Sequence, residues 1–168
     1  MTAIRAEALP KGALLERYRD SGAYTDCLVT EVTRRVSHEQ FIQAFYTSWL
    51  FKIERWILSW AVRKPSADAE ALELGQGTRE RFSAWTVEAR AKNQLLMCDF
   101  QQRTRSWLMI EALDEVTITR LYFGSAVVPL RPNGQKDRTF GTAFHLLLGF
   151  HKFYARALLR AAARNLPR

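Results

Sequence analysis

The sequence lacks several features that mark common classes of protein. Its two cysteines, Cys27 and Cys98, are far apart and form no C-x-x-C pair, so neither a disulfide framework nor a zinc site is indicated. Its three histidines do not follow H-x-x-E or H-E-x-x-H spacing, and it contains no G-x-G-x-x-G or P-loop motif. We therefore expect neither a metal ion nor another cofactor.

Long uninterrupted apolar runs are also absent. Residues 44–62 are rich in aromatic side chains, but Lys52, Glu54 and Arg55 interrupt them near the middle. A membrane-spanning helix needs about 20 mostly apolar residues, so we expect no transmembrane segment. The N-terminal residues carry scattered charges and lack the apolar stretch of a signal peptide, which predicts a cytoplasmic protein.

What remains fits one globular domain over residues 1–168. The chain is 48% hydrophobic and 25% charged, and its length allows a core that needs no disulfide or metal. The net charge is +8, and residues 142–168 contain five basic residues and no acid, so they contribute +5 and leave +3 for the rest. The basic excess is therefore concentrated at one end of the chain.

Hydrophobic periodicity predicts three helices. A capping box at Ser37–Gln40 begins a helix that should continue to Val62. Its core stripe is predicted to consist of Ile42, Trp49, Ile53, Trp56, Ile57 and Trp60. His38, in the first turn, is expected to be exposed. A short helix should follow between Ser66 and Gly75, and a long one over residues 142–165.

The other segments alternate in the manner of strands. Residues 24–36 predict one strand, and the segments 81–91, 94–100, 104–113 and 116–130 predict antiparallel strands joined by hairpins. Gly124 lies within the last segment, where a glycine can mark a bend or a bulge.

The order of these elements resembles that of the helix-grip proteins, the START-like or Bet v 1-like superfamily that includes polyketide cyclases. The resemblance covers residues 24–165 and rests on element order, and the first helix is longer than is usual in that group. It implies an α+β fold in which a curved antiparallel sheet wraps around the C-terminal helix, with a cavity between them. Residues 1–23 lie outside the resemblance and are expected to form an arm or a short helix.

Such a cavity predicts the binding of an apolar or amphipathic small molecule. The residues expected to contact it come from the aromatic strands and the last helix: Trp85, Trp107, Tyr122, Phe123 and His151. Three further side chains are candidate polar anchors, namely Glu88, Asp99 and Arg105. Asp99 is expected to lie opposite Arg105 across a hairpin and to pair with it.

Two alternatives remain open. A cyclase- or dehydratase-type enzyme could use the same cavity, with His151 and either Asp99 or Glu88 as the acid–base groups. A binding module could instead act through a row of basic residues in the last helix, which are Lys152, Arg156, Arg160 and Arg164. Its partner would be an anionic membrane surface or an acidic protein. Nucleic acid is disfavoured, because the row contains no aromatic residues for base stacking.

Overall fold

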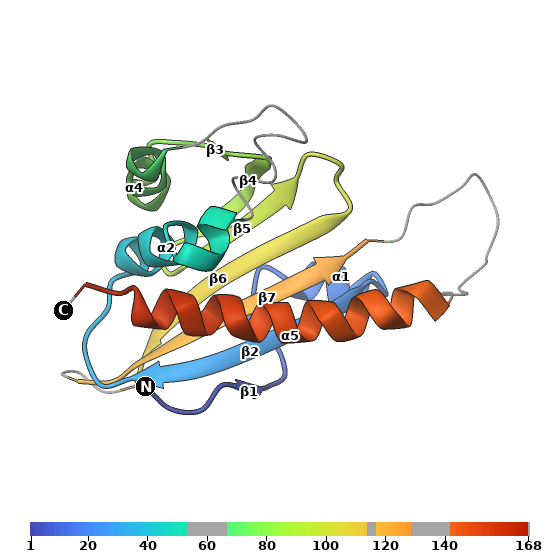
Figure 1. The fold of residues 1–168 in the computed structure, drawn as a ribbon, viewed down its shortest axis with the longest axis horizontal. Coiled ribbons are helices and arrows are strands. Elements are labelled where there is room, and N and C mark those ends of the chain that lie inside the picture. The colour runs from blue at the N-terminus through green and yellow to red at the C-terminus, as the bar shows by residue number, and fades with distance from the viewer. Residues whose placement is uncertain (54–66, 114–116, 129–141, 168) are drawn as a thin grey trace.

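The protein is an α+β structure built on one antiparallel sheet. The computed structural model describes residues 1–53, 67–113, 117–128 and 142–167, and of residues 142–152 it describes the backbone alone. Within these ranges a seven-stranded curved sheet has the order β1-β2-β7-β6-β5-β4-β3, and every neighbouring pair is antiparallel (Figure 1). Its strands are β1 (Arg5–Ala6), β2 (Tyr24–Val32), β3 (Arg81–Phe82), β4 (Trp85–Ala91), β5 (Gln94–Asp99), β6 (Thr104–Ala112) and β7 (Thr119–Val127).

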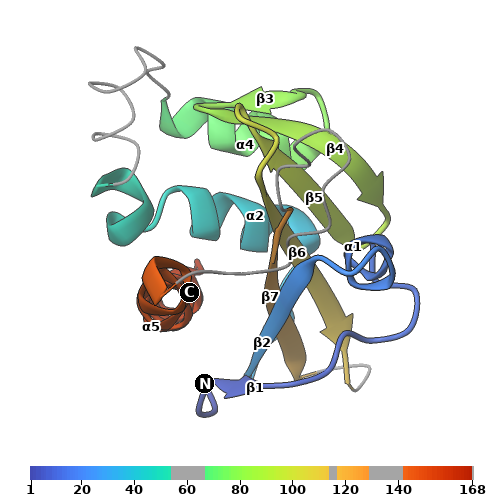
Figure 2. The same ribbon diagram turned by 90° about the vertical axis from the view of Figure 1, so that its right-hand side faces the viewer.

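Helices cover the two sides of the sheet unequally. The described helices are α1 (Glu16–Asp20), α2 (His38–Tyr46), α4 (Asp68–Gln76) and α5 (Thr142–Arg164). The end-on view shows α2, α4 and α5 on one side of the sheet and α1 on the other (Figure 2). We call the first the helix-facing side and the second the outer face. None of the described helices is long and apolar enough to cross a membrane.

The capping box is confirmed, but the first long helix is shorter than predicted. The Ser37 hydroxyl accepts a hydrogen bond from Gln40 N at 3.1 Å, and the Gln40 side chain accepts one from Ser37 N at 2.9 Å. This helix, α2, ends at Tyr46. There the Thr47 hydroxyl donates to the Gln43 carbonyl at 2.7 Å, and helical structure resumes over residues 49–53.

The break turns part of the predicted core stripe towards solvent. Trp49 is 65% exposed and Ile53 is 47% exposed, whereas Ile42, before the break, is fully buried. The expectation that Trp49 and Ile53 belong to the core is therefore wrong, because the interruption changes the rotation of the helical segment relative to α2. Three other members of the stripe lie outside the described residues: Trp56, Ile57 and Trp60.

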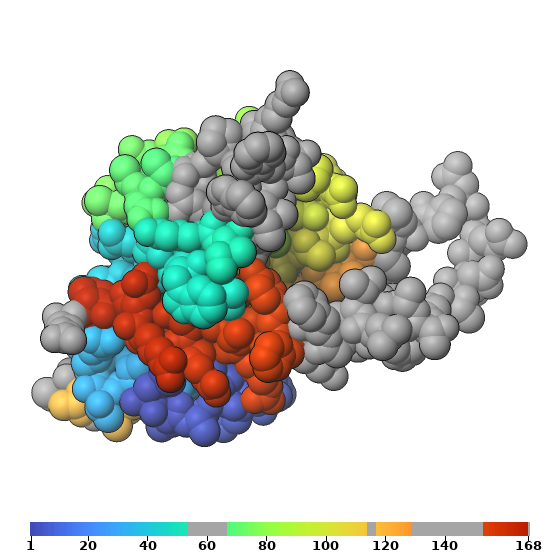
Figure 3. All heavy atoms as spheres, in the orientation of Figure 1, coloured from blue at the N-terminus to red at the C-terminus, as the bar shows by residue number. Residues whose placement is uncertain are grey.

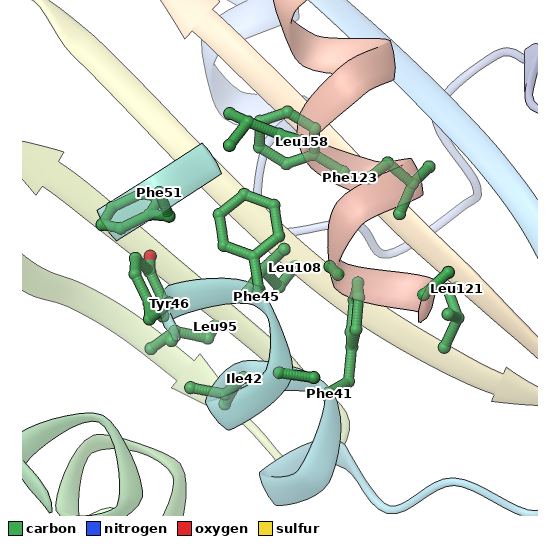
Figure 4. Close-up of a cluster of buried hydrophobic side chains, with 14 of the residues drawn as sticks. Phe41, Ile42, Phe45, Tyr46, Phe51, Leu95, Leu108, Leu121, Phe123 and Leu158 are labelled. Atoms are coloured by element: carbon green, nitrogen blue, oxygen red, sulfur yellow. The ribbon is translucent and has the colours of Figure 1, made fainter. Parts of the chain in front are cut away.

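The main core fills the helix-facing side. Phe45 lies at its centre, with its ring centroid 4.9 Å from that of Phe123 on β7 and 5.7 Å from that of Phe51 (Figure 4). Leu108 from β6 and Leu158 from α5 close the cluster. Each such buried side chain stabilises the fold by about 1.5–3 kcal/mol, so this packing holds α2 and α5 against the sheet.

A second, smaller core lies on the outer face beneath the N-terminal arm, residues 1–23. Leu15, at the start of α1, is fully buried there against Trp107 and other residues of β2, β5, β6 and β7. Gln94 joins the arm to the sheet, since its side-chain oxygen accepts hydrogen bonds from Leu14 N and Trp107 Nε1, both at 2.9 Å. The arm is thus an integral cover of the sheet.

The structural roles predicted for two glycines, a bulge at Gly124 and a helix end at Gly75, are wrong. Gly124 marks neither a bulge nor a bend, because β7 continues in register across it. A side chain there would approach Trp107 Cε3 to 2.9 Å, so the glycine permits close packing. The helix α4 continues past Gly75 to Gln76, and Gly77, whose φ of 79° suits a left-handed cap, terminates it.

Candidate functional site

The strand register places a row of polar side chains across one end of the helix-facing side. Asp26 on β2 pairs with Ser125 on β7, which in turn pairs with Ser106 on β6. Neighbouring strands lie about 4.8 Å apart, so the three residues form a compact group, which we call the polar row. Ser106 and Ser125 are both buried. Buried Thr30 and Thr119 lie on the same side of the sheet, towards its other end, and the polar row differs from them in having a carboxylate beside its hydroxyls.

Asp26 organises the polar row. One of its carboxylate oxygens accepts hydrogen bonds from the Ser125 hydroxyl at 2.6 Å and from Ser125 N at 2.9 Å. Tyr24, two residues earlier on the same side of β2, has its pKa raised to about 12 by burial and then by the charge of Asp26. The group therefore offers a negative charge and hydroxyls at one end of the sheet.

Trp85 adds a hydrogen-bond donor at the opposite edge of the same end. It begins β4 and packs against the main core, and Val87, two residues later, lies in register with Ser106 of the polar row through Met97 on β5. The indole Nε1 of Trp85 is buried and has no hydrogen-bond partner among the described residues. A buried donor without an acceptor costs about 1–3 kcal/mol, which makes it a natural contact for a ligand.

Apolar residues adjoin the polar row along the strands. Phe123 lies two residues from Ser125 on the same side of β7, and it pairs in register with Leu28 and Leu108. α5 runs along this side in front of β2 and β7 (Figure 1). Of the predicted contact residues, Trp85 and Phe123 therefore lie on the side that faces α5.

Trp107 and Tyr122 lie on the outer face, away from α5, so their expected place in a cavity beneath that helix is wrong. They alternate with Leu108 and Phe123, and side chains alternate between the two sides of a strand. Trp107 is fully buried beneath the arm, and the Tyr122 hydroxyl donates to Glu111 at 2.5 Å. Burial, and then this bond, raises the pKa of Tyr122 to about 12.

Two candidate anchors meet on the outer face. The carboxylate of Glu88 accepts a hydrogen bond from Arg105 Nε at 2.5 Å and further bonds from Tyr18 and Arg17 of α1. The Arg105 guanidinium also lies 4.8 Å from the centroid of the Tyr18 ring. Glu88 and Arg105 thus hold the arm against the outer face of the sheet, on the opposite side from α5.

The expected pairing of Asp99 with Arg105 is also wrong, because the hairpin register differs by one residue. Cys98, rather than Asp99, lies opposite Arg105. The Asp99 carboxylate instead accepts hydrogen bonds from the backbone nitrogens of Arg103 and Thr104 at 2.7 and 3.1 Å, which closes the β5–β6 turn. The side chains of the predicted His151 and Lys152 lie outside the described residues.

Sequence reasoning missed a half-buried histidine. His38 was expected to be exposed, but it is half-buried, with its Nε2 atom inaccessible, beside a groove of about 860 Å³ between the start of α2 and the ends of β6 and β7. Burial lowers the pKa of His38 to about 4, with a smaller contribution from Arg90 and an opposing one from a hydrogen bond to the Leu108 backbone. A signal was present, because position 38 shares a helix face with the buried Phe41 and Ile42.

Comparisons with known proteins add no family to this description. No model of a known protein family matches the chain. No curated protein matches it either. Within the described residues, no group of three histidine, cysteine or acidic side chains could hold a metal ion.

Proposed function

We propose that the protein binds an apolar or amphipathic small molecule between the helix-facing side of the sheet and α5. The observation that carries the proposal is the polar row at one end of the helix-facing side, in which Ser106 and Ser125 are buried and Asp26 is partly buried. Phe123 would contact the apolar body of the ligand, and the polar row would bind a hydroxyl or amine at its end. The Trp85 indole N–H would donate to an acceptor on the same molecule.

The arrangement of the chain supports a helix-grip fold for residues 24–165. The first long strand, β2, pairs with the last strand, β7, and the helices α2 and α4 lie between β2 and β3 in sequence. The long α5 ends the chain and packs on the sheet side that carries the main core. In a START-like protein the space between this helix and the sheet is the ligand cavity.

A cyclase- or dehydratase-type reaction in the same space would require an acid and a base beside the ligand. Glu88 lies on the outer face and Asp99 closes a turn, so Asp26 would have to act with His151. Tyr24, with a pKa of about 12, is a weak acid near neutral pH. Binding is therefore the function that the described residues favour.

The direct test is native mass spectrometry of the protein purified from its source, which should reveal a bound small molecule. In parallel, anilinonaphthalene sulfonate should bind the folded, delipidated protein and be displaced by palmitate, which offers an apolar chain and an acceptor for the Trp85 N–H but no group for the polar row. Trp85→Phe, which removes one N–H group, should weaken palmitate binding about fivefold to tenfold. Trp107→Phe is the matched control on the outer face and should leave affinity unchanged. Absence of any probe binding to the folded wild type would refute the proposal.

A further inference from the structure

An exposed apolar group lies on one face of the molecule, apart from the polar row. Trp49 is 65% exposed, Ile53 is 47% exposed, and Phe153 on α5 is 73% exposed. The space-filling view shows the described segment after α2 side by side with the C-terminal half of α5 on this face (Figure 3). Large side chains at such exposures are costly in water unless a partner covers them, and several together mark an interaction surface.

Trp49 and Phe153 border a shallow groove on α5. The groove has a volume of about 200 Å³, and the small side chains of Ala157 and Ala161 line it between the larger ones. Phe153, Ala157 and Ala161 recur every four residues, so they form one row along the helix. Trp49, from the segment after α2, stands beside this row.

A row of cations borders the same groove. Arg156, Arg160 and Arg164 line it, and at a rise of 1.5 Å per residue successive members lie about 6 Å apart along the axis. Within the described residues, no carboxylate lies within ion-pair distance of these three guanidinium groups. Arg156 donates a hydrogen bond to the Ile4 carbonyl at 2.9 Å, which leaves its charge unbalanced.

Several arginines elsewhere in the described residues are neutralised by carboxylates. Arg79 pairs with Glu73 at 2.7 Å, and Arg120 pairs with Glu31 at 2.8 Å. The sequence of α5 contains no acidic residue at all. Three cations without an ion pair among the described residues therefore lie together beside exposed apolar side chains, and this combination fits an anionic partner that also has an apolar interior.

We propose that this face, comprising Trp49, Ile53, Phe153 and the three arginines, docks on the surface of an anionic lipid bilayer. Tryptophan and phenylalanine are favoured at the boundary between headgroups and acyl chains, and arginines bind the lipid phosphates. The docking surface is distinct from the proposed ligand site and does not depend on it.

Other partners fit the same face less well. Single-stranded nucleic acid uses cations and aromatic rings, and Trp49 and Phe153 supply the aromatic neighbours that were not expected beside the basic row. Ile53, however, has no ring on which a base could stack. A second copy of the chain would place like charges against each other. A bilayer accommodates the aliphatic, aromatic and cationic groups together.

The test is sedimentation of the full-length protein with phosphatidylcholine vesicles, with and without phosphatidylglycerol. Wild type should bind the anionic vesicles at low salt, bind the neutral ones far less, and lose binding as salt rises. Each arginine near an anionic surface contributes about fivefold, so Arg160→Glu with Arg164→Glu should weaken binding by at least about 25-fold. Trp49→Ser should weaken it without changing the charge.

Arg81→Glu with Arg103→Glu is the matched control, because it changes the net charge equally at exposed positions on strand β3 and the β5–β6 turn. This variant should bind at least fivefold more tightly than the α5 variant. The proposal is overturned if wild type fails to bind anionic vesicles at low salt, or if the two double variants bind equally. Tighter binding of wild type to a single-stranded oligonucleotide or to polyglutamate than to vesicles would also overturn it.

Discussion

Replacing Trp107 with alanine should destabilise the fold by about 3–5 kcal/mol, the usual range for removing a buried tryptophan. The side chain is fully buried, and its ring centroid lies 6.0 Å from that of Tyr122. Its Nε1 donates to Gln94, which also holds the arm through Leu14, so the substitution loosens the arm as well as leaving a cavity. Such a loss is a large part of the 5–15 kcal/mol that stabilises a typical domain.

The measurement is urea unfolding of wild type, Trp107→Ala and Trp107→Phe, followed by far-UV circular dichroism. Phenylalanine keeps most of the ring and loses the hydrogen bond, so its cost should be clearly smaller than that of alanine. Where Trp107→Ala is still folded, its affinity for palmitate should equal that of wild type, because the residue lies on the outer face. A change in unfolding free energy below about 1 kcal/mol would refute the second core beneath the arm.

Three further substitutions test other parts of the structure. Gly124→Ala should destabilise by about 1–3 kcal/mol in urea unfolding, because its Cβ would lie 2.9 Å from Trp107 Cε3; a neutral or stabilising result would contradict that packing. For His38, the pKa of about 4 lies below the ordinary 6.5, so its contribution to stability is complete above pH 6.5 and is lost as the pH falls towards 4. Unfolding across this range should show wild type losing about 3 kcal/mol more than His38→Gln, and equal losses would show that the histidine is not buried as a neutral group. Ser37→Ala should cost about 1 kcal/mol by thermal or urea unfolding and Ser37→Gly only a few tenths, and no loss of stability in Ser37→Ala would contradict the capping bond to Gln40.

Much of the fold could be predicted because local patterns and tertiary packing agree. The capping residues of α2, the alternation in β4 to β7 and the apolar face of α5 each specify one element, and their order predicts an antiparallel sheet with a terminal helix. The interruption after Tyr46 was missed, because apolar periodicity continues through Thr47 and Ser48 while their hydroxyls compete for backbone groups.

The candidate site was predicted less well, because the sequence does not reveal which side of a strand faces a helix. Trp107 and Phe123 both belong to aromatic-rich strands, and their opposite positions follow from the register with β2 and β5. The N-terminal arm determines the surroundings of the aromatic residues on the outer face. Leu15 and its neighbours cover that face, so these aromatic residues pack into a second core. Asp26 was overlooked, although it lies two residues from both Tyr24 and Leu28 and so shares the helix-facing side of β2 with them.

The most direct test of a ligand site on the helix-facing side compares two indole N–H signals by ¹H–¹⁵N NMR. Trp85 Nε1 is buried on that side with no hydrogen-bond partner in the described part of the chain, whereas Trp107 Nε1 is bonded to Gln94 on the outer face. The signals can be assigned with the Trp85→Phe and Trp107→Phe variants. Titration with palmitate should shift the Trp85 signal saturably and leave that of Trp107 in place. A saturable shift at Trp107 with none at Trp85, or no shift at either, would contradict the account.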